Sequence, residues 1–179
     1  MVTAYNLFWS LLSVVAEGIV IVLAVSLISK KENKFVIFWR KHALGFAFIV
    51  ALLSMLGSLG YSNVIGYTPC TLCWFQRICM YSQVVILAIA LCKRDRGALV
   101  YSFWLSSAGI LFSAYHCLLE RGFVPDGFCT ATGGVSCAQN YVFILGYITI
   151  PMMALSAFAL IMVTAIVGLK KEAAPLEIR

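Results

Sequence analysis

Long apolar runs separated by short polar segments dominate the hydropathy pattern of the chain. An α-helix needs about 20 predominantly apolar residues to cross a hydrocarbon core of about 30 Å. Each of these runs is long enough to do so, and the last is long enough to tilt or to extend beyond the membrane. The runs cover residues 7–28, 43–61, 74–92, 99–119 and 141–169. The pattern therefore predicts five transmembrane helices.

The composition supports a membrane setting with lipid as the solvent. Hydrophobic residues make up 63% of the chain and charged residues 11%, and the mean hydropathy is +0.98. A soluble domain carries about 25% charged residues. Five spans in a chain of 179 residues leave no room for a separate soluble domain. We expect an all-α integral membrane protein in which residues 1–179 form a single membrane domain.

The 13 basic residues are distributed unevenly along the chain. All except Arg77 and Arg121 follow the first, third or fifth apolar run. Short clusters of this kind do not form one polar face, so they do not indicate a nucleic-acid partner. Under the positive-inside rule they mark the cytoplasmic side. The N-terminus is then outside, the C-terminus is cytoplasmic, and the connections 62–73 and 120–140 face the outside. The clustered residues are Lys30, Lys31, Lys34, Arg40, Lys41, Lys93, Arg94, Arg96, Lys170, Lys171 and Arg179.

The first apolar run also has a length that a signal peptide can have. A secretory signal begins with a basic segment, yet residues 1–6 contain no Lys or Arg. We therefore expect the run to remain as a transmembrane helix. Glu17 lies in the middle of it, where a carboxyl group is expected to be protonated or paired. The pattern identifies no partner for Glu17.

Cys70 and Cys73 form a Cys-x-x-Cys motif at the outer end of the third predicted span, preceded by Pro69. Unpaired N–H groups and the positive end of the helix dipole stabilise a thiolate at such a position. Thiolates are the attacking species in disulfide exchange. Cys73 lies deeper in the first turn, so we expect the helix end to stabilise the thiolate of Cys73 most. The cysteines predicted to act only as small apolar residues are Cys79, Cys92 and Cys117.

Two further residues near the outer ends of the spans are candidates for cofactor binding. Arg77 lies four residues after Cys73, on the same helix face. Such a charge can hold a thiolate or a quinone carbonyl oxygen, whereas the alternative is an arginine that reaches the lipid headgroups. His116 ends the fourth span, one turn before Glu120. It can pass protons or orient a quinone, or it can be an interfacial histidine with no such role.

Cys129 and Cys137 form a second pair in the predicted outer loop 120–140. Turn residues at 125–127 and 133–134 predict a mobile loop that can bring the two sulfurs together. A structural bridge is one interpretation, but the membrane-proximal pair favours exchange with a soluble partner. The seven residues between these cysteines are a wide gap for a zinc site. No metal site is predicted.

The segment 69–77, Pro-Cys-Thr-Leu-Cys-Trp-Phe-Gln-Arg, resembles the membrane disulfide-forming proteins of the DsbB family, and most closely its BdbC-type branch. The segment 146–151, Gly-Tyr-Ile-Thr-Ile-Pro, is similar to that branch too. The resemblance covers about residues 53–161 and includes the order of the two cysteine pairs. It implies a four-helix transmembrane bundle, to which the span 7–28 is an N-terminal addition.

The resemblance also implies an activity. Members of the family reoxidise a thioredoxin-like, DsbA-type partner and pass the electrons to ubiquinone or menaquinone, which supports disulfide bond formation in exported proteins. By position, Cys129 is implied to be attacked by the partner's thiolate. Cys137 is implied to exchange toward Cys70, and Cys73 to face the quinone. The residues implied to lie near the quinone are Arg77 and His116.

Two other functions fit parts of the pattern. A vitamin K epoxide reductase-like protein uses similar parts, but that family places its loop cysteines before its Cys-x-x-Cys. A small membrane transporter or assembly subunit with structural disulfides should tolerate the loss of Cys70 or Cys73. The order of the pairs favours the DsbB resemblance, which implies a quinone-dependent protein disulfide oxidoreductase in the plasma or inner membrane of a prokaryote. Its resting disulfide is either Cys129–Cys137 or Cys70–Cys137.

Overall fold

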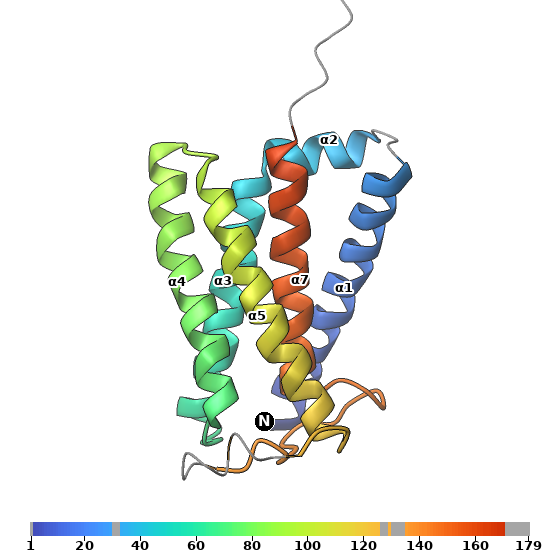
Figure 1. Ribbon diagram of the computed structural model, residues 1–179, viewed down its shortest axis with the longest axis vertical. Coiled ribbons are helices and arrows are strands. Elements are labelled where there is room, and N and C mark those ends of the chain that lie inside the picture. The colour runs from blue at the N-terminus through green and yellow to red at the C-terminus, as the bar shows by residue number, and fades with distance from the viewer. Residues whose placement is uncertain (1, 30–32, 126–128, 130–134, 171–179) are drawn as a thin grey trace, which may run out of the picture.

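The computed structural model describes residues 2–29, 33–125, 129 and 135–170. The predicted turn residues Asp126, Gly127, Gly133 and Gly134 and the basic residues Lys30, Lys31, Lys171 and Arg179 lie outside these ranges. The elements are all helical and are labelled in Figure 1 where there is room. They are α1 (Val2–Ser29), α2 (Lys34–Lys41), α3 (Ala43–Leu59), the π-helix η1 (Gly60–Val64), α4 (Thr71–Lys93), α5 (Ala98–Glu120) and α7 (Ile150–Leu169).

Five helices in the described part of the chain are long and apolar enough to cross a membrane. They are Val2–Ser29, Ala43–Val64, Thr71–Lys93, Ala98–Glu120 and Ile150–Leu169. The protein is thus a multi-pass, all-α membrane protein, and the prediction of five spans is confirmed. α4 begins and α5 ends at one end of the molecule, which we call the cysteine end (Figure 1).

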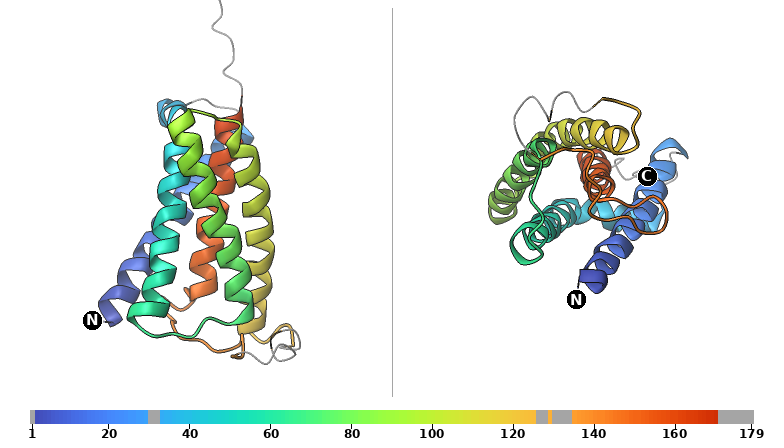
Figure 2. Two further views of the ribbon diagram at one scale, coloured as in Figure 1. Left: turned by 90° about the vertical axis from the view of Figure 1, so that its left-hand side faces the viewer. Right: turned by 90° about the horizontal axis from the view of Figure 1, so that it is seen from below.

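Helices α3, α4, α5 and α7 form a four-helix bundle, seen end-on in Figure 2. Its core combines large side chains such as Leu87 and Phe158 with small ones such as Ala47 and Ala165. Small residues let transmembrane helices approach closely. At Gly109 of α5, an added Cβ would overlap the ring of Phe158 on α7. The close approach of these two helices therefore depends on that glycine.

Helix α1 lies outside this bundle, tilted against α7 (Figure 1). Its Leu23 is buried in a second cluster with Leu160 and Val167 of α7. The short helix α2 carries the basic linker across the end of the bundle opposite the cysteine end. There the indole N–H of Trp39 donates a hydrogen bond of 3.1 Å to the hydroxyl of Thr164. The sequence pattern did not predict α2, because eight residues are too short for a span.

The last transmembrane helix is shorter than the apolar run that predicts it. We expected the span to begin at residue 141, but α7 begins at Ile150. Leu145 and Gly146 have φ values of 54° and 78°, which no right-handed helix accommodates. An isolated β-bridge joins Ile144 and Ile148 across this reversal. The apolar residues before α7 thus belong to a loop at the cysteine end, and hydropathy alone does not separate such a loop from a span.

Candidate active site

The first turn of α4 brings the thiols of the Cys-x-x-Cys motif together. Cys70 is the N-cap, with extended backbone at φ −76° and ψ 174°, and its Sγ accepts a hydrogen bond of 3.4 Å from the backbone N–H of Cys73. The two Sγ atoms lie 2.9 Å apart, and both cysteines are free thiols. This pair is therefore placed to form a disulfide with little movement.

The accepting sulfur of the motif is that of Cys70. The hydrogen bond between the Cys70 and Cys73 thiols, followed by the contact with His116, holds the pKa of the Cys70 thiol well below its ordinary value, although burial opposes this shift. We expected the helix end to stabilise the thiolate of the deeper residue, Cys73, most, and this expectation was wrong. The N-cap side chain receives the orphan N–H of the first turn, and Cys70 holds that position.

His116 connects the two cysteine pairs. Its ring is 3% exposed, and Nε2 lies 3.8 Å from Cys70 Sγ and 3.1 Å from the carbonyl oxygen of Cys137. Its Nδ1 lies 3.3 Å from Nε2 of Gln76. With the Gln76 amide donating to Nδ1, the imidazole carries its proton on Nε2 and donates it to the Cys137 carbonyl. The sequence placed His116 near this end, and Gln76 lies in the segment 69–77 that carries the family resemblance, but no role was predicted for Gln76.

The loop pair is oxidised in this structure. Cys129 and Cys137 form a disulfide with a Cα–Cα distance of 6.0 Å, and the two residues are 0% and 1% exposed. Both pack in one buried cluster with Cys70, Leu72 and Leu119. Of the two resting disulfides left open by the sequence, the structure contains Cys129–Cys137.

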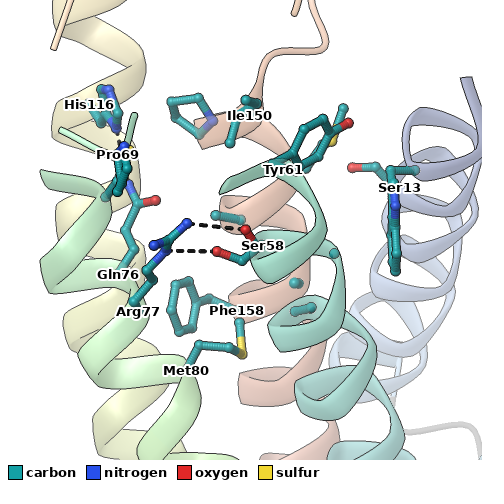
Figure 3. Close-up of a pocket in the computed structure, with 18 of the residues that line it drawn as sticks. Ser13, Ser58, Tyr61, Pro69, Gln76, Arg77, Met80, His116, Ile150 and Phe158 are labelled. Atoms are coloured by element: carbon teal, nitrogen blue, oxygen red, sulfur yellow. Dashed lines mark hydrogen bonds between the residues drawn. The ribbon is translucent and has the colours of Figure 1, made fainter. Parts of the chain in front are cut away.

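Arg77 is held against the neighbouring helix α3 in this structure. Its Nε donates a hydrogen bond of 2.9 Å to Oγ of Ser58, and its Nη2 donates one of 3.1 Å to the Ser58 carbonyl oxygen. Figure 3 shows the side chain reaching from α4 across to α3. The guanidinium also lies over the ring of Trp74, 5.3 Å from its centroid. Ser58 belongs to no recognisable motif, so sequence reasoning missed it.

A cavity of about 310 Å³ lies beside these groups. Cys70, Cys73, Arg77 and His116 line one part of it. Much of the remaining wall is apolar, with Met80 and Phe158 among the residues drawn in Figure 3. The wall also includes residues of α1 and α3. The site thus combines a reduced thiol pair, a fixed positive charge and an apolar space large enough for a ring-shaped ligand.

The same residues include a possible set of metal ligands. One ligand atom each from Cys70, Cys73 and His116 lies within 4.8 Å of the others. Two thiolates on one tetrahedral zinc ion would lie about 3.8 Å apart, given Zn–S bonds of about 2.3 Å. The observed 2.9 Å between the sulfurs fits a dithiol close to a disulfide better than a metal site. The absence of a metal site stays a prediction.

Glu17 has the partners that the sequence pattern did not identify. Its Oε1 accepts a hydrogen bond of 2.8 Å from the hydroxyl of Ser156 on α7. Its Oε2 accepts one of 3.0 Å from the hydroxyl of Tyr147, in the loop before α7. The carboxyl group therefore joins α1 to the bundle. Both partners lie more than 100 residues away in the chain, so no local pattern indicates them.

Comparison with known proteins matches this architecture to a family. Residues 40–168 match the family model described as "Disulfide bond formation protein DsbB". A "Probable disulfide formation protein C" of Halalkalibacterium halodurans is 39% identical over 127 residues, which are 70% of this chain and 92% of that protein. The "Disulfide bond formation protein C" of Bacillus subtilis is 40% identical over 119 residues, which are 65% of this chain and 85% of the relative. No solved structure is significantly similar to the chain.

Proposed function

The chain belongs to the family of disulfide bond formation protein DsbB, and on this premise we propose that it reoxidises a thioredoxin-like, DsbA-type partner and passes the electrons to a membrane quinone. That the chain is a multi-pass membrane disulfide oxidoreductase follows from the family and the five spans. The observation that carries the finer proposal is the contact at His116. It joins an oxidised pair, Cys129–Cys137, to a reduced pair, Cys70 and Cys73.

The proposed orientation places the cysteine end outside the cytoplasm. The basic residues of α2 and of the α4–α5 turn lie at the opposite end of the described bundle (Figure 1). The positive-inside rule assigns that end to the cytoplasm. The N-terminus is then outside and the C-terminus is cytoplasmic, in the plasma or inner membrane of a prokaryote. Both cysteine pairs thereby face an oxidising compartment, in which disulfides persist.

The first half-reaction transfers the disulfide to the partner. A thiolate of the reduced partner attacks Cys129 Sγ, the Cys129–Cys137 bond breaks, and Cys137 leaves as a thiolate. The second partner thiol then attacks the mixed disulfide and releases Cys129 as a thiol. The partner, which begins as one thiolate and one thiol, loses two electrons and one proton and becomes oxidised, and the loop pair becomes the Cys137 thiolate and the Cys129 thiol. Because both loop cysteines are buried, this step requires the loop to open.

The second half-reaction regenerates the loop disulfide. The Cys137 thiolate attacks Cys70 in a Cys70–Cys73 disulfide and displaces Cys73, and Cys129 then attacks Cys137 and displaces Cys70. The products are a Cys129–Cys137 disulfide and the dithiol at Cys70 and Cys73, which is the state in this structure. Cys70 is a good leaving group because its pKa is lowered. His116, between Cys70 and the Cys137 carbonyl, is placed to hold or move the proton.

The residues around the cavity fit a quinone. Its apolar walls suit a hydrophobic ring, and Arg77 offers a positive charge in the cavity that Cys73 also lines. The two hydrogen bonds to Ser58 fix that charge in place. When bound, the quinone, either ubiquinone or menaquinone, supplies an acceptor for the two electrons and two protons that leave the thiols of Cys70 and Cys73. Arg77 would hold the oxygen substituents of the quinone.

Partner oxidation by the purified protein tests this proposal. The full chain is mixed with quinone and a reduced thioredoxin-like partner, and multiple-turnover oxidation of the partner is measured for the wild type, Cys73→Ala and Cys129→Ala. We expect both variants to lose turnover, because each breaks one half-reaction. Cys79→Ala is the matched control, since Cys79 lies on the same helix in the apolar core. Undiminished turnover in Cys73→Ala and Cys129→Ala would favour a transporter or assembly subunit with structural disulfides.

A further inference from the structure

Helix α1 lies outside the part of the chain that matches the family model, which begins at residue 40. It nevertheless forms one wall of the cavity beside the thiols. Trp9, Ser13 and Ala16 line that wall. Their spacing of four and three residues places them on one face of the helix. The added helix therefore contributes side chains to the site as well as a fifth span.

Contacts at the cysteine end hold this face of α1 in position. The hydroxyl of Tyr5 donates a hydrogen bond of 3.1 Å to the carbonyl oxygen of Gly57 on α3. The ring of Trp9 packs against the same glycine, where a Cβ would lie only 3.1 Å from the ring. Glu17, one turn after Ser13, accepts the hydrogen bonds from α7 and its preceding loop. The wall is thus fixed on both sides of Ser13.

Three polar groups on the α1 side of the cavity have no hydrogen-bond partner among the described residues. They are the indole N–H of Trp9, the hydroxyl of Ser13 and the hydroxyl of Tyr61. Ser13 and Tyr61 are each only 6% exposed. Figure 3 shows the side chains of Ser13 and Tyr61 directed toward one another from α1 and η1. Buried polar groups nearly always have partners, so three unpaired donors around one cavity point to an absent ligand with acceptor atoms.

The state of Ser13 is unusual even for its own helix. Ser10 and Ser26 of α1 donate to the carbonyl oxygens four residues earlier, at 2.7 Å and 2.8 Å. This is the ordinary way in which a helical serine satisfies its hydroxyl in an apolar setting. The Ser13 hydroxyl makes no such bond in the described structure. It is therefore available to a molecule in the cavity.

We propose that α1 supplies a subsite for the quinone, in which Ser13, Trp9 and Tyr61 donate hydrogen bonds to its oxygen substituents on the side of the cavity away from Arg77. This inference rests on the proposed function. Arg77 and the thiols then hold one side of the ring, and the α1 donors hold another. The added helix sets the affinity for the electron acceptor, while the four-helix bundle carries the thiol chemistry.

Direct quinone binding to the full-length protein in detergent tests the subsite without turnover. The probes are a radiolabelled short-chain ubiquinone and a radiolabelled short-chain menaquinone, and the dissociation constant is measured by equilibrium dialysis. Loss of one neutral hydrogen bond should raise the dissociation constant of the bound quinone by about 3- to 10-fold in Ser13→Ala. Trp9→Phe and Tyr61→Phe should give increases of similar size. Ser10→Ala is the matched control, because Ser10 is equally buried on α1 but does not line the cavity.

The outcomes separate this inference from the proposed function. If the wild type binds a quinone and Ser13→Ala binds it equally well, the α1 subsite is wrong and the proposed function stands. If the wild type binds neither quinone, both fail. Ser13→Ala removes an unpaired hydroxyl, so its thermal midpoint should not fall below that of the wild type. A variant that keeps this midpoint but binds quinone more weakly therefore reports the lost contact and not a loss of folding.

Discussion

At the scale of single residues, the position of a cysteine relative to its helix decides its chemistry. Cys70 holds the N-cap, where its Sγ accepts a hydrogen bond from the backbone N–H of Cys73 and lies 2.9 Å from Cys73 Sγ. The sequence predicted a stabilised thiolate in this motif but assigned it to the wrong sulfur, because the first helical residue cannot be read from the motif alone. Gln76 and Ser58 were missed for a related reason. Their roles arise from contacts with His116 and Arg77 on other helices.

Removing the imidazole of His116 should raise the pKa of the Cys70 thiol. The contact with His116 acts to lower that pKa. In the wild type the thiolate persists as the pH falls below the ordinary range of a cysteine, and it is protonated only below the lowered pKa. In His116→Ala the transition should move to higher pH, so alkylation of reduced Cys70 at neutral pH should be slower.

The rate of alkylation by iodoacetamide against pH, followed by mass spectrometry of the Cys70 peptide, measures this shift. His42→Ala is the matched control, because the chain has only two histidines and His42 is exposed on the connection between α2 and α3. A profile of His116→Ala identical to that of the wild type would contradict the contact between His116 and Cys70.

At the scale of helices, close packing of α5 on α7 depends on Gly109, where a Cβ would overlap the ring of Phe158. Gly109→Ala should therefore destabilise the bundle by about 1–3 kcal/mol, the usual cost of overpacking a core. Gly45→Ala on α3 is the matched control, because a Cβ there meets nothing within 4 Å. The free energy of unfolding in mixed micelles measures both variants. Equal stability of the two would show that α5 and α7 are not packed in this way.

The number of spans was predictable from sequence, whereas their ends and neighbours were not. A long run of apolar residues indicates that lipid surrounds the segment. The hydropathy pattern therefore identified all five membrane-spanning helices. The same signal included residues 141–149, which are apolar but have backbone angles that exclude a helix at Leu145 and Gly146. The placement of α1 against α7 depends on Glu17, Tyr147 and Ser156, which are brought together only by the fold.

At the scale of the whole molecule, the two ends of the bundle differ in chemistry. The cysteine end carries both cysteine pairs and the cavity, and the opposite end carries the basic clusters in the described chain. We expect a cysteine introduced by Asn63→Cys to react with a membrane-impermeant maleimide in intact cells. One introduced by Asp95→Cys should react only after the membrane is permeabilised.

Both positions are exposed, which makes them comparable probes. Labelling is scored as the increase over the parent protein, because that protein has cysteines of its own. The reverse pattern, with position 95 labelled in intact cells and position 63 protected, would place the cysteine end in the cytoplasm and remove the basis for disulfide formation there.

The central claim is that electrons from the partner pass through two cysteine pairs to a quinone. The most direct measurement is an anaerobic titration of the wild type and Cys73→Ala with reduced thioredoxin-like partner, in which quinol and partner disulfide are quantified together. The account predicts one quinol for each partner disulfide beyond the first turnover in the wild type. It predicts at most one partner disulfide per protein and no quinol in Cys73→Ala. Continued quinol formation in Cys73→Ala, or partner oxidation by the wild type without quinol, would contradict it.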